Sequence, residues 1–490
     1  MTSTHTHNCL RRRRSGCLLH PTSLPGGGLG TDAVRFIDFL AGAGFSVWQM
    51  LPVNNTDKYG CPYQGTSVHA GNPRFIDLMP LSQKEWLNVN RLNNRSNNLA
   101  AVSALIAEAR HGFIRRATDV ELGDYQAFKQ THIHWLDDYA LFSAIKQEHQ
   151  GKPWWKWPQR LRMRDKTALK SFSEEHSEQI ENYCFEQFLF FSQWQELRKL
   201  AHDRGILLFG DVPIFTAHDS VDVWAYPDYF QLDEAGQPTV VAGVPPDYFS
   251  PTGQRWGNPV YNWPHLAKDG FRWWVERLRT QLELFDLVRL DHFRGFVALW
   301  EIPAHCPTAE EGTWQPAPGR ELFKIFHKEF GDLPLIAEDL GIISEEVVKL
   351  ADDFMLPGIK VLQFAFDNSA GNPYLPHNHN LNSVVYTGTH DNNTTLGWFC
   401  NLDDTKQQHV LEYLQYPNET MPWPLINSAL QSVCPLAIVP MQDLLGLDAS
   451  HRMNTPGTMA GNWRWRFDWE WITSDLIKKL WHLNALYGRL

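Results

Sequence analysis

Eight short apolar segments, each ended by Pro, Gly, Asp or His, constrain the fold of this chain more than any other feature. Most of them are continuously apolar, which is typical of parallel strands that are buried on both faces. Helix-like segments lie between them, for example residues 32–42, 271–285 and 344–350. The eight segments are residues 15–20, 46–51, 206–211, 287–291, 335–339, 360–364, 384–390 and 436–442.

This alternation of strands and helices predicts an α/β fold, a (β/α)8 TIM barrel. An open doubly wound sheet is the alternative, but no Gly-x-Gly-x-x-Gly fingerprint follows the first strand. Two connections are too long for simple crossovers: residues 81–204, which are mostly helical, and residues 213–262, which combine loops with small strands. Both follow carboxyl ends of strands, so we expect them above the catalytic face. Residues 1–14 are expected to be disordered, and residues 15–490 to form a single catalytic barrel.

Composition narrows the functional classes. The net charge of −11 argues against a nucleic acid or an anionic membrane surface as partner, because both favour a basic protein surface. We find no run of 18 apolar residues. Seven scattered cysteines without a Cys-x-x-Cys pair favour reduced thiols in the cytoplasm. His5, His7 and Cys9 could hold a metal, but a disordered terminus is the favoured interpretation.

Acidic residues follow several of the predicted strands. Strand three ends at Asp211, strand four at Asp291, strand five at Glu338-Asp339 and strand seven at His390-Asp391. Active sites of such barrels are built at the carboxyl ends of the strands. The sequence therefore predicts an acidic rim on one face of the barrel.

Each acidic group also has a structural interpretation when it is taken alone. Arg289 and Asp291 share one face of a strand, so they form either a structural ion pair or a nucleophile with its cation. Alternation directs Glu338 and Asp339 to opposite faces, and the pair could instead cap a helix. Asp391 could also be a helix cap. Together, three carboxylates satisfy a retaining glycosidase, which needs a nucleophile and an acid about 5–5.5 Å apart and benefits from a stabilising third charge.

Longer motifs make the chain similar to a known family. They include Leu18-Leu-His-Pro-Thr-Ser-Leu-Pro25, Pro62-Tyr-Gln64, Gly253-Gln-Arg-Trp-Gly-Asn-Pro259, Arg289-Leu-Asp-His-Phe-Arg-Gly295, Ala337-Glu-Asp-Leu-Gly341, Gly388-Thr-His-Asp-Asn392 and Arg452-Met-Asn-Thr-Pro-Gly457. In this order they resemble the 4-α-glucanotransferases called amylomaltases or disproportionating enzymes, nearly from end to end. One segment, Tyr59-Gly-Cys-Pro-Tyr-Gln64, is one residue shorter than the pattern usual in that family.

The resemblance implies an amylase-like barrel that requires no metal and no organic cofactor. It implies that Asp291 is the nucleophile, Glu338 the acid and base, and Asp391 the stabiliser of the transition state. Arg289, Asp211 and His390 match residues that bind sugar hydroxyls and orient the nucleophile. Tyr59, Asp247 and Trp256 match positions that line the substrate groove, and residues 243–259 resemble a loop that covers the site.

The implied substrates are α-1,4-glucan donors and acceptor sugars such as maltodextrins and glucose; the oligomeric state stays open. Transfer requires an acceptor site that binds sugar and excludes water. Trp256 and Tyr248 on the covering loop, with Tyr59 opposite, are candidates for stacking the acceptor. The rival functions are an α-glucan hydrolase of the amylase type and a non-catalytic glucan-binding protein. The aromatic run Gly461-Asn-Trp-Arg-Trp-Arg466 is compatible with sugar binding but also with any interface.

Overall fold

The computed structural model describes residue 10 and residues 12–57, 59–92, 99–246, 250–341, 343–458 and 460–490. Eight parallel strands form one sheet with the neighbour order β10-β11-β12-β1-β2-β3-β6-β9. The end strands β9 and β10 also lie beside each other, and Ala337 N donates to Pro357 O across them at 2.8 Å. The predicted barrel is confirmed. Its strands are β1 (Arg14–Leu18), β2 (Val47–Gln49), β3 (Leu207–Val212), β6 (Leu287–Leu290), β9 (Leu335–Ala337), β10 (Gly358–Val361), β11 (Ser383–Tyr386) and β12 (Leu436–Pro440).

Both faces of the strands are buried, as their continuous apolar sequence predicts. In β3, Leu208 belongs to the large cluster between strands and helices, whereas its neighbour Phe209 belongs to a second cluster. That second cluster also holds Leu287, Ile336 and Leu436 from other strands, and side-chain alternation places it inside the barrel. The structured chain begins before the predicted boundary at residue 15, because Arg14 is the first residue of β1.

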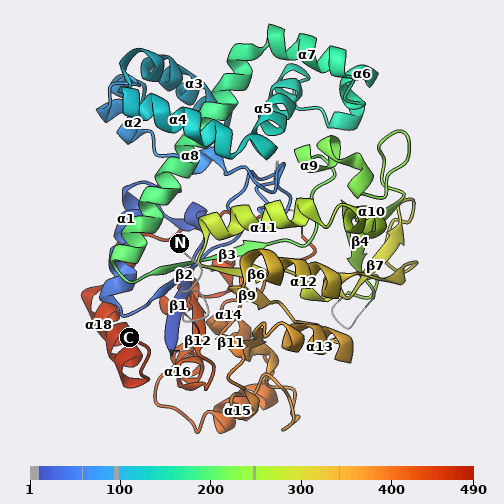
Figure 1. Cartoon of the computed structure of the whole chain (residues 1–490). Coiled ribbons are helices and arrows are strands. Elements are labelled where there is room, and N and C mark those ends of the chain that lie inside the picture. The colour runs from blue at the N-terminus through green and yellow to red at the C-terminus, as the bar shows by residue number, and fades with distance from the viewer. Residues whose placement is uncertain are drawn as a thin grey trace.

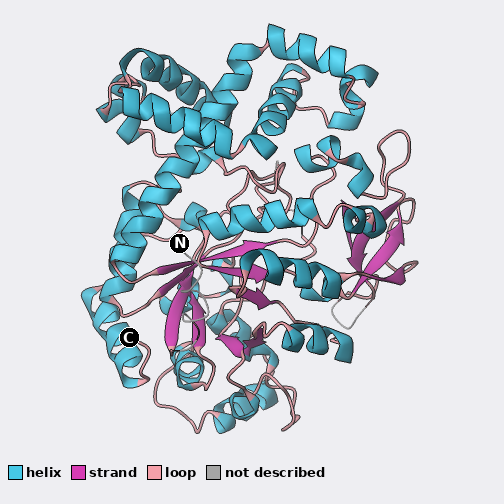
Figure 2. Ribbon diagram, in the orientation of Figure 1, coloured by secondary structure: helices cyan, strands magenta, loops and turns pink. Residues whose placement is uncertain are grey.

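Helices surround the barrel and extend to one side of it (Figure 1; Figure 2). Between β10 and β11, residues 362–382 contain only 3-10 turns, so this connection lacks the α-helix of an ideal barrel unit. Around the barrel lie α1 (Thr31–Gly42), α10 (Trp263–Lys268), α11 (Arg272–Leu284), α12 (Gly319–Phe330), α13 (Glu345–Asp353), α14 (Thr395–Cys400), α15 (Asp404–Tyr413), α16 (Trp423–Gln431), α17 (Met441–Leu444) and α18 (Ser474–Leu486).

The connection between β2 and β3 holds a group of helices at the top of Figure 1. The last of them, α8, contacts α3, α4 and α5 along its length and then leads into β3. Helix α4 begins with a capping box, in which the side chains of Thr118 and Glu121 satisfy each other's backbone amides. The helices are α2 (Met79–Gln83), α3 (Leu99–Arg116), α4 (Asp119–Thr131), α5 (Ile133–Glu148), α6 (Gln159–Arg162), α7 (Lys166–Glu175) and α8 (Ser177–Asp203).

A small antiparallel sheet lies beside the barrel, at the right of Figure 2. Its strand order is β5-β4-β7-β8, with β4 (Val240–Val244), β5 (Gln254–Pro259), β7 (Ala298–Pro303) and β8 (Thr313–Pro316). Helix α9 (Val221–Ala225) precedes it in the connection between β3 and β6. Half of this sheet therefore comes from the segment after β6, outside the predicted insertion at residues 213–262. In the part of the chain that the structure describes, no helix is long and apolar enough to cross a membrane.

Candidate active site

The predicted acidic residues follow strands at the same end of the barrel. Asp211 is the penultimate residue of β3, Asp291 follows β6 directly and Glu338 follows β9 directly. The strand before Asp391 is shorter than predicted: β11 ends at Tyr386, so His390 and Asp391 lie on the loop that follows it. Parallel pairing from β3 through β6 to β9 sets the first three carboxylates side by side.

Arg289 connects two of these carboxylates. Its Nη1 lies 2.8 Å from Oδ1 and 2.7 Å from Oδ2 of Asp211, and 2.9 Å from Oδ1 of Asp291. The side chains of Arg289 and Asp211 are only 6% and 1% exposed, whereas that of Asp291 is 28% exposed. Asp291 therefore has the adjacent cation that its position two residues from Arg289 predicted, and it keeps access to the open side of the site.

Glu338 has very different surroundings. Its Oε2 accepts a hydrogen bond from His292 N at 2.7 Å, and its Oε1 accepts one from Leu340 N at 3.3 Å. Burial raises the pKa of Glu338 to about 8, with Arg289 opposing this rise and the nearby Asp291 adding to it. At neutral pH this carboxyl group is mostly protonated, so the site pairs a proton donor with an arginine-bound carboxylate.

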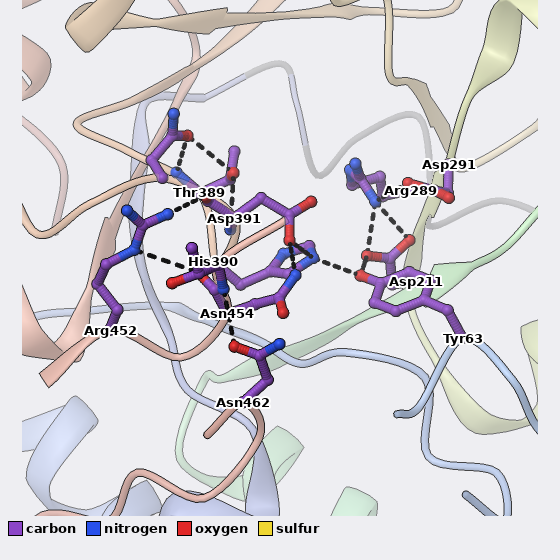
Figure 3. Close-up of polar contacts among 12 residues, drawn as sticks. Tyr63, Asp211, Arg289, Asp291, Thr389, His390, Asp391, Arg452, Asn454 and Asn462 are labelled. Carbon is purple, nitrogen blue, oxygen red and sulfur yellow. Dashed lines mark hydrogen bonds and ion pairs between the residues drawn. The ribbon is translucent and has the colours of Figure 1, made fainter. Parts of the chain in front are cut away.

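Asp391 and Asp211 are connected through Tyr63 and His390 (Figure 3). The Tyr63 hydroxyl donates to Oδ2 of Asp211 at 2.8 Å and lies 2.9 Å from Nε2 of His390. Since this hydroxyl donates to Asp211, it accepts from His390. The same Nε2 lies 3.3 Å from Oδ1 of Asp391. One chain of polar contacts thus runs across the site from Arg289 to Asp391.

The loop after β11 is held by a second set of contacts. Asn454 Nδ2 donates to Oδ1 of Asp391 at 2.6 Å, and Arg452 Nη2 donates to the carbonyl oxygen of Asp391 at 2.8 Å. The cap of α14 is Thr394, whose hydroxyl accepts from Gly397 N at 3.1 Å. The interpretation of Asp391 as that cap is therefore wrong. The side chain of Asp391 is 44% exposed and belongs to the network of the site instead.

Glu338, and not its neighbour, faces the site. Asp339 accepts a hydrogen bond from Ile359 N on β10 at 2.7 Å, on the side away from β6. Neither residue is the cap of a helix: α13 begins at Glu345 with Ser344 before it. The choice between the two carboxylates, which strand alternation left open, is thus made by the neighbouring strands.

Of the predicted groove residues, the structure describes Trp256 and Tyr59. Trp256 in β5 is half-buried, and its ring centroid lies 4.8 Å from that of His292, the residue after Asp291. Tyr59 is 44% exposed, on the segment that leads to Tyr63. Asp247 and Tyr248 lie outside the described residues.

Three site residues lacked an assigned role in the sequence: Tyr63, Asn454 and Trp463. The Tyr63 ring stacks on His390 with centroids 5.3 Å apart, and the Trp463 ring lies 5.9 Å from Tyr63 and 6.0 Å from His390. All three belong to motifs that were recognisable in the sequence, but they come from loops far along the chain from the strand ends. Among the described residues, no group of three or more His, Cys, Asp or Glu side chains is arranged to hold a metal ion.

Comparison with known proteins gives one consistent result. A family model described as 4-alpha-glucanotransferase matches residues 19–472. The chain is 48% identical over 475 residues to the 4-alpha-glucanotransferase of Thermus thermophilus, covering 93% of this chain and 94% of that protein. It is 47% identical to the enzyme of the same name from Synechocystis, covering 98% and 99%. The structure of the Streptococcus agalactiae amylomaltase in complex with acarbose matches with a TM-score of 0.93 and 36% identity, covering 98% of this chain and 100% of that one.

Proposed function

Because this chain belongs to the 4-alpha-glucanotransferase family and is an enzyme with that activity, we propose that it works by a retaining double displacement. It transfers α-1,4-glucan segments from a donor maltodextrin to the 4-hydroxyl of an acceptor sugar. The observation that supports this mechanism best is the contrast between Asp291, bound to a guanidinium group, and Glu338, whose pKa is raised to about 8. A nucleophile and a general acid require these two opposite states.

In the first step an Oδ of Asp291 attacks the anomeric carbon, and the bond from this carbon to the glycosidic oxygen breaks. The proton of Glu338 passes to the departing oxygen, which leaves as a 4-hydroxyl. In the second step the ionised Glu338 takes the proton of the acceptor 4-hydroxyl, whose oxygen attacks the anomeric carbon and releases Asp291. Asp391 stabilises the positive charge that develops at the sugar ring in both steps.

The remaining residues of the network hold the donor sugar. Arg289, Asp211 and His390 present a buried set of hydrogen-bonding groups, and their mutual contacts fix their orientation before the substrate arrives. Tyr63 joins this set, since its hydroxyl bridges Asp211 and His390. We assign these residues to binding of sugar hydroxyls and to orientation of Asp291.

A transferase must favour a sugar over water as the acceptor. Trp256 supports this preference, because its half-buried ring packs at a right angle against the ring of His292, next to the proposed nucleophile. We assign Trp256 and Tyr59 to stacking of the acceptor, with Asp247 as a further groove residue. Trp256→Ala is expected to raise the ratio of hydrolysis to transfer; an unchanged ratio, with both products measured, would remove Trp256 from this role.

Incubation with maltotriose tests the proposed function. Longer maltodextrins together with glucose are the expected products of transfer. Shorter sugars alone would indicate the hydrolase, and an unchanged substrate would indicate a binding protein. Asp291→Asn should abolish turnover, because it removes the nucleophilic carboxylate; wild-type turnover in this variant would contradict the mechanism.

We propose a cytoplasmic location, without a nucleic-acid or membrane partner. The support is that all six described cysteines are free, as expected in a reducing compartment. The net charge of −11 also disfavours anionic polymers and lipids. Fractionation of the producing cells checks this location, and recovery with secreted or membrane proteins would contradict it.

A further inference from the structure

The carboxylate of Asp339 joins β9 to β10, the two strands at the ends of the sheet order. Ala337 N donates to Pro357 O at 2.8 Å, which is a backbone bond between them. In a regular parallel pair the next amide of β10, that of Ile359, would donate to a carbonyl oxygen of β9. Ile359 N instead donates to Oδ1 of Asp339 at 2.7 Å. A side chain therefore replaces a ladder hydrogen bond where the barrel closes.

Gly358 allows this close approach. A Cβ atom at Gly358 would lie 2.4 Å from Oδ2 and 2.8 Å from Cγ of Asp339, closer than side-chain contacts tolerate. The amide of Gly358 donates in the other direction, to Asn382 O at 3.2 Å. The carboxylate of Asp339 is thus packed against the backbone of β10, and its position depends on the missing side chain at residue 358.

The backbone of Glu338 is held from the opposite side by β6. Glu338 N donates to Leu290 O at 3.1 Å, and Phe293 N donates to Glu338 O at 3.1 Å. These contacts and the bond from His292 N to Oε2 fix Glu338 relative to Asp291. On the β10 side, by contrast, the segment after β9 is held through the side chain of Asp339.

We propose that Asp339 is a positioning residue: it closes the β9–β10 seam and thereby holds Glu338 where its proton reaches the glycosidic oxygen. The inference rests on the proposed role of Glu338 as the general acid. Without the bond to Ile359 N, the segment after β9 loses its link to β10 and Glu338 is displaced. Displacement of a catalytic group by about 1 Å can cost a factor of about 100 in rate.

Two donors that differ in their need for a proton test this role. Cleavage of maltotriose requires protonation of the leaving oxygen, whereas α-maltosyl fluoride releases fluoride ion without it. In both reactions kcat/KM reports the formation of the covalent glycosyl-enzyme, which is a maltosyl-enzyme when the donor is α-maltosyl fluoride. Asp339→Ala is expected to lower kcat/KM for maltotriose about 10- to 100-fold and that for the fluoride less than about threefold. An equal loss with both donors, or no loss with maltotriose, would overturn the proposal.

Two further variants keep the test decisive if Asp339→Ala does not fold. Asp339→Asn retains an oxygen that accepts from Ile359 N, so it should stay within about threefold of wild type with both donors. Gly358→Ala keeps the Asp339 carboxylate, but the added methyl group pushes this carboxylate away from β10. This variant should therefore reproduce the selective loss with maltotriose. The role would be contradicted if Gly358→Ala lowered kcat/KM equally for both donors. It would also be contradicted if Asp339→Asn lowered kcat/KM for maltotriose as selectively and as strongly as Asp339→Ala.

Glu338→Gln separates this inference from the proposed function. If Glu338 is the acid, this variant loses activity with maltotriose and retains fluoride release. Equal loss with both donors would refute the role of Glu338 itself. A selective effect in Glu338→Gln, combined with an equal loss for both donors in Asp339→Ala, would refute only the role of Asp339.

Discussion

Asp291 and Glu338 follow neighbouring strands, but their side chains have different surroundings. Arg289 lies 2.9 Å from Asp291, whereas burial is the main influence on Glu338 and raises its pKa to about 8. The two environments arise beside one strand pair, because β6 supplies Arg289 and the turn that follows β6 supplies the amide of His292, which binds Glu338. At the scale of single residues, the proposed division between nucleophile and acid is therefore a consequence of how β6 and β9 are packed.

This division predicts the alkaline limb of the pH profile. A general acid acts only while it holds its proton, and Glu338 loses its proton as the pH rises through about 8. We expect kcat/KM for maltotriose to be constant near neutral pH and to fall about tenfold per pH unit above about 8. With α-maltosyl fluoride this limb should be absent, since no leaving oxygen is protonated. The same limb with both donors would assign it to another group.

The elements of the barrel could be predicted from the sequence because continuous apolar runs have few alternatives in an α/β chain. Their ends were less predictable. The run at residues 384–390 stops pairing at Tyr386, and the hydroxyl of Thr387, the next residue, donates to Oδ2 of Asp443 at 2.7 Å. The run at residues 360–364 becomes a 3-10 turn from Leu362 onward. Apolar composition predicts burial, but the end of a strand depends on partners elsewhere in the chain.

The small sheet and part of the site could not be predicted from the sequence, because they depend on contacts between segments that are distant along the chain. Strand β4 pairs with β7, which lies beyond β6, and local patterns carry no signal for such a partner. Tyr63 reaches Asp211 and His390 across 148 and 327 residues. The carboxylates were predictable because the barrel itself aligns strand ends, whereas Tyr63 and Asn454 depend on how loops fold over that rim.

The helical segment between β2 and β3 packs on α11 through a group of buried histidines. His132 precedes α5, and its Nε2 lies 3.6 Å from Glu283 of α11; His69 Nδ1 lies 2.8 Å from the Thr280 hydroxyl. Burial lowers the pKa of His132 to about 4, with the nearby His134 adding to this effect. Burial raises the pKa of Glu283 to about 7, so the glutamate is largely neutral where His132 would become charged.

This contact predicts a loss of stability on acidification. His132 has a lower pKa in the folded protein than the ordinary value of 6.5, so its contribution is present above pH 6.5 and is lost as the pH falls through about 4. His132→Phe should reduce the decrease in unfolding free energy between pH 7 and pH 4 by up to about 3 kcal/mol. The measurement is the free energy of unfolding of wild type and of His132→Phe as a function of pH. Glu283 acts in the opposite direction, but it is present in both proteins, so its contribution is removed when one curve is subtracted from the other. Two parallel curves would contradict the prediction.

At the scale of the whole molecule, the two terminal regions close the barrel at the end opposite the site. Arg489 is fully buried and donates to carbonyl oxygens on both sides of the β1–β12 pair, including Arg14 O at 2.6 Å and Pro435 O at 3.2 Å. Its Nε donates to Leu430 O at 2.7 Å, and Nη2 of Arg13 donates to the same oxygen at 2.8 Å. Burial lowers the pKa of Arg489 to about 9, and Arg13 adds to this effect.

Arg489 should therefore matter for stability and not for the chemistry. Arg489→Met keeps much of the side-chain volume but leaves several buried carbonyl groups without a donor, each of which costs about 1–3 kcal/mol when unsatisfied. We expect the free energy of unfolding to fall by about 3 kcal/mol or more, while kcat/KM for maltotriose stays within about twofold at temperatures where the variant is folded. Leu490→Ala is the matched control, because the side chain of Leu490 is 48% exposed and its removal should cost less than about 1 kcal/mol. A loss of unfolding free energy in Arg489→Met no larger than in Leu490→Ala would contradict the stabilising role of Arg489. A selective loss of activity in the folded variant would show instead that the two ends of the barrel are coupled.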